Sequence, residues 1–168
     1  MNKLLIIIFV GSLVFLVAMS FFVSNKEEMH VSNPAPDSHL KFEGWDTDLK
    51  VSLEKSKVSK KNILMLFTGS DWCPPCKMLE SKIFSSDKFK EYASKNLELL
   101  VIDFPRYRKM SDEQSAYNES LSDKFKIDGF PTMVFLDSNE NELTRFGYMG
   151  DDTEQFIERY ERKIKSEK

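Results

Sequence analysis

The sequence has few cysteines and histidines, and it has no excess of positive charge. Its 168 residues include two cysteines and two histidines, and both histidines, His30 and His39, lie in a polar stretch far upstream of the cysteines. A zinc site built on the cysteine pair would need two further Cys or His ligands. The net charge of −3 at pH 7 argues against a nucleic-acid binder. A metal site is therefore disfavoured, and no nucleic-acid partner is expected.

Both cysteines lie in one short motif, which is Trp72-Cys73-Pro74-Pro75-Cys76-Lys77. An apolar run of strand length over residues 62–68 precedes it, and residues 77–84 carry apolar side chains at helical spacing. The pair is therefore expected where a strand passes into a helix. The first amides of a helix lack intrahelical partners and the dipole is positive there, so a thiolate at Cys73 is stabilised.

This position predicts that Cys73 is a nucleophile and that Cys76, one turn later, closes a disulfide onto it. An inert structural disulfide is the alternative. Its loop would hold only two residues, and such a short loop gains little chain-entropy stabilisation. The pattern favours redox chemistry over a structural bond.

The motif resembles the active site of the thioredoxin family, and its Pro-Pro pair is similar to that of tryparedoxins and nucleoredoxins. A second stretch, Gly129-Phe130-Pro131-Thr132 before a short apolar strand, resembles the cis-proline loop of the family. Gly147 falls where the family often has a glycine beside the site. The resemblance covers about residues 45–166. One departure is that the buried acid near the end of the strand before the motif is absent, and Leu66 and Phe67 stand in its neighbourhood.

The resemblance implies an α/β fold, a thioredoxin-like three-layer sandwich with a central mixed sheet flanked by helices. It implies thiol–disulfide exchange by Cys73 and Cys76 without a metal or organic cofactor, the redox-active disulfide being the only reactive group. The side chains expected to shape the substrate groove are Trp72, Pro74, Pro75, Phe130 and Pro131. Ordinary packing is the alternative for Trp72, and a plain loop proline for Pro131.

Apolar spacing and capping residues predict the elements in the order α-β-α-β-α-β-β-α. The first helix is expected to place Leu49, Leu53 and Val58 in the core. The expected ranges are 49–60, 62–68, 77–84 with a second helical segment to 95, 97–104, 111–125, 133–136, 142–148 and 154–165.

The amino-terminal part is expected to be an appendage to this domain. Residues 4–23 contain no charge and follow Lys3, which predicts a membrane anchor (1–23) with the remainder on the extracytoplasmic, periplasmic side. A cleaved signal peptide, leaving a secreted or periplasmic protein, is the competing interpretation, with residues 18–20 as the cleavage site. Residues 24–44 are interpreted as a linker and residues 45–168 as the thioredoxin-like domain.

The predicted function is exchange of dithiol and disulfide with disulfide-containing exported proteins, supplied with electrons by an upstream dithiol reductant. The reducing direction is favoured because Pro74 and Pro75 remove two amides that would stabilise the Cys73 thiolate. The alternatives are an oxidase or isomerase of exported proteins and a non-catalytic interaction module. The basic residues 106–109 are interpreted as a solvated loop, with a partner surface as the alternative.

Overall fold

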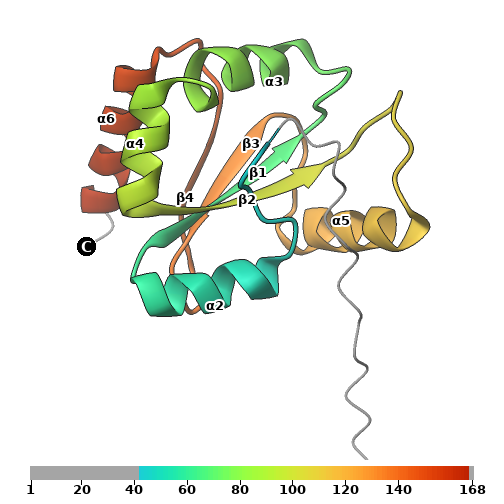
Figure 1. The fold of residues 1–168 in the computed structure, drawn as a ribbon, viewed down its shortest axis with the longest axis horizontal. Coiled ribbons are helices and arrows are strands. Elements are labelled where there is room, and N and C mark those ends of the chain that lie inside the picture. Colours follow the sequence, from blue (N-terminus) through green and yellow to red (C-terminus); the bar gives the residue numbers. More distant parts are fainter. Residues whose placement is uncertain (1–41, 167–168) are drawn as a thin grey trace, which may run out of the picture. The chain divides into compact units, whose positions relative to one another are not determined.

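Four strands form one mixed sheet at the centre of the computed structural model, which describes residues 42–166 (Figure 1). Helices cover both faces of the sheet, as the three-layer prediction requires. The elements in chain order are α2 (Leu49–Ser59), β1 (Asn62–Thr68), α3 (Pro74–Leu79), the π-helical turn η1 (Glu80–Phe84), α4 (Asp87–Asn96), β2 (Leu97–Asp103), α5 (Asp112–Lys124), β3 (Thr132–Leu136), β4 (Glu142–Gly147) and α6 (Thr153–Ser166).

The strand before the cysteine motif, β1, lies in the interior of the sheet, whose order is β2-β1-β3-β4. It runs parallel to β2 and antiparallel to β3. Residues 63–67 of β1 are at most 1% exposed, because a strand covered on both faces can be apolar at every position. The predicted βαβ unit and central strand are confirmed.

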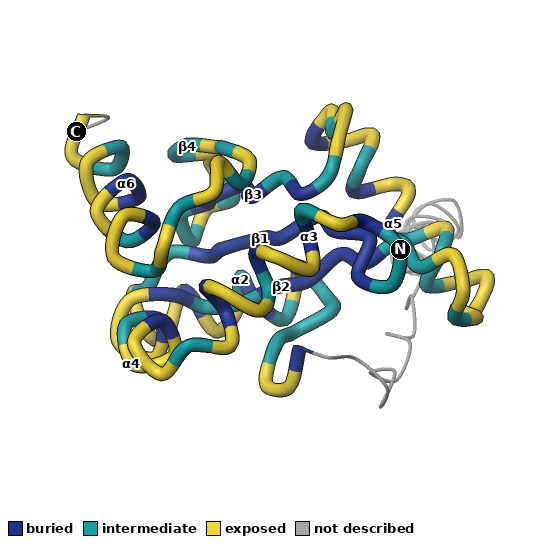
Figure 2. The backbone as a smooth tube through the Cα atoms, turned by 90° about the horizontal axis from the view of Figure 1, so that it is seen from above, coloured by how far each residue is buried: buried dark blue, intermediate teal, exposed yellow. Residues whose placement is uncertain are grey.

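Two separate cores lie on the two faces of the sheet. One face packs against α3, η1, α4 and α6, and the other packs against α2 and α5. In Figure 2 the buried residues follow the strands, while the exposed residues lie on the outer sides of the helices. The predicted stripe on α5 joins the second core, where Leu121 and Phe125 are buried and Tyr117 is partly buried.

Three helices begin at side chains that cap their first amides. Asp48 accepts from the N–H groups of Lys50 and Val51, Ser86 accepts from Phe89, and Ser111 accepts from Gln114. Such a cap satisfies an amide that has no partner inside the helix. These caps set the starts of α2, α4 and α5 where the sequence predicts them.

The expectation that Val58 lies in the core is wrong, because its side chain is 84% exposed. The buried face of α2 carries Leu49 together with Ser52 and Ser56, both 0% exposed. The Ser56 hydroxyl donates to the carbonyl oxygen of Lys61, which satisfies it in the interior. The buried face of α2 therefore carries two small hydroxyl side chains, and Val58 lies on the exposed face of this helix.

The predicted anchor and most of the predicted linker lie outside the described residues. Phe42, assigned to the linker from the sequence, is 5% exposed and packs against Trp45 with 5.3 Å between ring centroids. Within residues 42–166, no helix has the length and apolar character needed to cross a membrane.

Candidate active site

The two cysteines lie at the start of α3, directly after the turn that follows β1. Cys73 is the N-cap residue of this helix, and Pro74 and Pro75 occupy its first two positions. Proline is accepted there because the amide it lacks would have no intrahelical partner. Cys73 and Cys76 form a disulfide, and each is 3% exposed. The strand-to-helix position predicted for the pair is confirmed.

The sulfur of Cys73 faces the beginning of the helix. The N–H of Cys76 approaches this sulfur with a nitrogen–sulfur distance of 3.4 Å. The two intervening residues are prolines, so neither has an N–H to offer. The helix start therefore turns one amide toward the position at which a thiolate forms during exchange.

The loop between α5 and β3 lies against the cysteine pair. Its Phe130–Pro131 peptide bond is cis, and the carbonyl oxygen of Phe130 is 3.8 Å from the Cys73 sulfur. A β-carbon at Gly147 on the neighbouring strand β4 would lie 3.3 Å from the Pro131 carbonyl oxygen. A larger residue at position 147 would press on this loop. Gly147 therefore lies beside the site, as the family resemblance implies.

Trp72 connects the motif to the segments that follow β2 and α5. Its indole N–H donates to the carbonyl oxygen of Phe104 at 2.7 Å, and its ring meets the Phe130 ring edge-on at 6.1 Å between centroids. Phe104 in turn stacks on Phe130 at 5.1 Å. A β-carbon at Gly69 would come within 2.5 Å of the indole ring, so this orientation of Trp72 requires glycine there.

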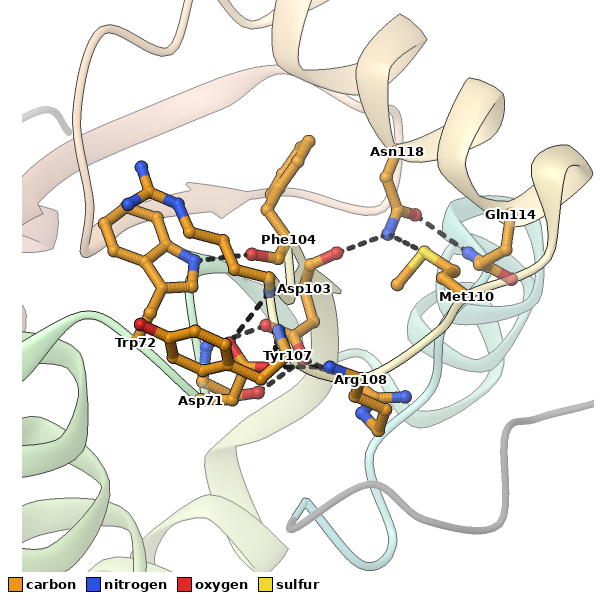
Figure 3. A network of polar contacts seen from close by, with 11 residues as sticks. Asp71, Trp72, Asp103, Phe104, Tyr107, Arg108, Met110, Gln114 and Asn118 are labelled. Carbon is orange, nitrogen blue, oxygen red and sulfur yellow. Dashed lines mark hydrogen bonds and ion pairs between the residues drawn. The ribbon is translucent and has the colours of Figure 1, made fainter.

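The carboxylate of Asp71 holds the loop that follows β2, as Figure 3 shows. It accepts three consecutive backbone N–H groups, from Arg106 at 2.9 Å, Tyr107 at 2.8 Å and Arg108 at 3.0 Å. Partial burial alone would raise the pKa of Asp71, but the three N–H groups and the Arg108 guanidinium hold this pKa below its ordinary value.

A second carboxylate, Asp103 at the end of β2, fixes the turn before the motif. It is 3% exposed and accepts from the backbone N–H of Ser70 at 2.9 Å and from the Ser70 hydroxyl at 2.6 Å. It also pairs with Arg108 at 2.8 Å. The structure therefore has a buried acid at this end of the sheet, but it lies on β2. Its carboxylate oxygens accept hydrogen bonds from Ser70 and Arg108.

Sequence reasoning missed both carboxylates. The available signals were an acid at the end of an apolar strand and an acid directly before the motif tryptophan. Ser70, which bonds to Asp103, lies 33 residues before it in the chain. The three N–H groups that bond to Asp71 lie 35 to 37 residues after it. Spacing within one segment carries no information about such distant contacts.

The structure brings five of the predicted site residues together, namely Trp72, Cys73, Cys76, Phe130 and Pro131. Pro74 is exposed and Pro75 is half-buried on the first turn of α3. Their contact with a substrate stays a prediction. Within residues 42–166, no group of three or more His, Cys, Asp or Glu side chains could hold a metal ion, and His30 and His39 lie outside this range.

Comparison with known proteins agrees with this geometry. The model of the thioredoxin-like domain family matches residues 49–163. The chain is 34% identical over 122 residues to the disulfide bond reductase DsbH of Chlamydia pneumoniae, covering 73% of this chain and 71% of that protein. It is 35% identical over 98 residues to the thiol:disulfide interchange protein DsbD of Yersinia pestis, covering 56% of this chain but 15% of that longer protein.

Solved structures show the same architecture. A structure described as DsbH oxidoreductase superposes with a TM-score of 0.66 at 28% identity, covering 80% of this chain and 95% of that one. A thioredoxin from Thermus thermophilus superposes with a TM-score of 0.53 at 13% identity, covering 71% of this chain and 86% of that one, which supports the fold alone.

Proposed function

The chain belongs to the thioredoxin-like domain family, and we propose that within this family it reduces disulfide bonds of exported proteins. It is a thiol–disulfide oxidoreductase whose CxxC pair is Cys73 and Cys76. The reducing direction, the substrates and the cellular location belong to the proposal. One observation supports the reducing direction. The helix start directs the N–H of Cys76 toward the Cys73 sulfur, whereas Pro74 and Pro75 have no N–H to direct toward it.

The reaction proceeds by two exchanges at sulfur. The Cys73 thiolate attacks one sulfur of the substrate disulfide, forms a mixed disulfide and releases the other substrate sulfur as a thiolate, which takes a proton from water. The Cys76 thiolate then attacks the Cys73 sulfur and releases the second substrate thiolate. Two electrons pass from the protein dithiol to the substrate. The protein is left with the Cys73–Cys76 disulfide, and an upstream dithiol must reduce it before the next turnover.

The direction depends on how strongly the protein stabilises the Cys73 thiolate. A strong oxidant has a greatly stabilised thiolate in its reduced form, and amides at a helix start are a main source of this stabilisation. Pro74 and Pro75 take two of these amides away, which supports a reductant. The name of the DsbH relative, a disulfide bond reductase, supports the same direction.

Equilibration of the purified protein with defined ratios of reduced and oxidised glutathione tests this direction. We expect a reduction potential well below that of a strong oxidant such as DsbA, about −120 mV. A value near −120 mV would contradict the argument from missing amides and would favour the alternative function, an oxidase or isomerase.

A non-catalytic interaction module is the second alternative, and turnover separates it from an enzyme. With a supplied dithiol, the protein should accelerate the reduction of insulin disulfides, and Cys73→Ser should abolish the acceleration. An interaction module would show no acceleration in either form.

The location of the protein is proposed from the sequence outside the described residues. Residues 4–23 are uncharged over twenty positions and follow Lys3, which supports an anchor in the cytoplasmic membrane with the domain on the extracytoplasmic side. Carbonate extraction of membranes should leave the full-length protein in the pellet. Release of a shortened protein would favour a cleaved signal peptide instead.

A further inference from the structure

The loop that follows β2 forms a cationic surface beside the active-site motif. Arg106, Arg108 and Lys109 carry three positive charges within four residues. Arg108 pairs with the buried carboxylate of Asp103. Arg106 has an exposed side chain, and within residues 42–166 no ion pair joins it to a carboxylate.

The guanidinium of Arg106 lies over the ring of the motif tryptophan, Trp72. Its central carbon lies 3.6 Å from the centroid of the Trp72 ring. A guanidinium that stacks on an aromatic ring by its face keeps its N–H groups in the plane of the fork, where they can bind a carboxylate with two parallel bonds. Trp72 directly precedes Cys73 in the chain, so a carboxylate bound by Arg106 is held at the residue next to the nucleophile.

The backbone under Arg106 is fixed before any partner arrives. The carboxylate of Asp71 accepts the N–H groups of residues 106, 107 and 108 (Figure 3). A surface that is already ordered loses little conformational entropy when it binds. Tyr107 is 83% exposed on this fixed loop, and an exposed tyrosine offers a large rigid contact area to a peptide.

We propose that Arg106 and Tyr107 form a substrate-recognition surface that selects disulfides flanked by an acidic residue in an extended peptide segment. An extended chain rises about 3.3 Å per residue. Arg106 stacks on Trp72, the residue directly before Cys73, so we expect the acidic residue within about three positions of the substrate cysteine. This inference rests on the proposed reductase function and names its substrate preference.

Peptides with one changed residue test the proposal. Three disulfide-bridged peptides differ only in the residue two positions from one cysteine, which is Glu, Gln or Lys, and each is mixed with the fully reduced protein. The rate of mixed-disulfide formation is followed by rapid acid quench. We expect the Glu peptide to react about two- to fivefold faster than the Gln peptide, the range of an exposed ion pair, and the Lys peptide to react more slowly. The Glu-to-Gln ratio should fall toward one in 0.5 M salt.

Two variants locate the preference. In Arg106→Gln the Glu-to-Gln ratio should fall to about one, whereas Arg162→Gln, which removes an exposed charge from α6, should keep the wild-type ratio. The ratio cancels any effect of Arg106 on the reactivity of Cys73 itself. Equal slowing of all three peptides in Arg106→Gln with an unchanged ratio would overturn the proposal. Wild-type protein that reduces the three peptides at one rate would overturn it and leave the reductase function intact, whereas failure to reduce any peptide would overturn both.

Discussion

Removal of the Asp103 carboxylate should destabilise the fold more than removal of an exposed acid. Asp103→Ala leaves the backbone N–H and the hydroxyl of Ser70 without their acceptor, and Ser70 is only 7% exposed. Each buried donor without a partner costs about 1 to 3 kcal/mol. Arg108, whose side chain is 23% exposed, also loses this ion-pair partner, and breaking a largely buried pair adds to the loss. Together these effects predict a fall of about 3 kcal/mol in the free energy of unfolding.

Urea unfolding of the disulfide-bonded protein, followed by tryptophan fluorescence, measures this fall. Asp103→Asn keeps one acceptor oxygen for Ser70 and should lose less, about 1 to 2 kcal/mol. Asp123→Ala removes an exposed acid near the end of α5 and should stay within about 0.5 kcal/mol of the wild type. A loss below about 1 kcal/mol in Asp103→Ala would show that the Ser70 turn does not depend on this carboxylate.

Three further predictions concern the cysteines, Asp71 and α5. Cys76→Ser should accumulate mixed disulfides with substrate proteins on non-reducing gels, whereas Cys73→Ser should not, because only Cys73 starts the exchange. Equal trapping by both variants would contradict the assigned roles. The folded state lowers the pKa of Asp71, so its stabilisation is fully present above the unfolded pKa of about 3.9 and is lost as the pH falls through the lower folded value. The difference in unfolding free energy between wild type and Asp71→Asn should therefore shrink from pH 6 to pH 2.5, and a constant difference would refute this linkage. The Tyr117 hydroxyl accepts the backbone N–H of Leu49 at 2.8 Å, and burial raises the pKa of Tyr117 to about 12. Tyr117→Phe should lower the free energy of unfolding in urea by about 1 kcal/mol. An unchanged free energy would show that water replaces the hydroxyl.

The sequence predicts the elements around the motif because their signals are local. The apolar run of β1 and the caps at Asp48, Ser86 and Ser111 each mark an element within a few residues. The position of the cysteine pair follows from the same signals. The family resemblance adds the loop at Pro131, whose approach to Cys73 cannot be read from spacing.

The parts that the sequence did not predict depend on long-range partners or on polar burial. Val58 matched the expectation for a core residue, but α2 buries Ser52 and Ser56, whose hydroxyl groups give no hydrophobic signal. Asp71 and Asp103 look like ordinary surface acids until the fold brings the 105–108 loop beside the turn before α3. Their roles are fixed by tertiary contacts, which one sequence does not display.

The contacts around Trp72 and Cys73 join segments that are far apart in the chain, so the site is completed late in synthesis. The indole N–H of Trp72 bonds to a residue 32 positions later, and the Cys73 sulfur contacts a carbonyl 57 positions later. A ribosome-bound chain that ends before Phe130 therefore carries both thiols without the surrounding groove. The contacts of Phe130 with Cys73 and Trp72 can form only after the loop between α5 and β3 has been translated.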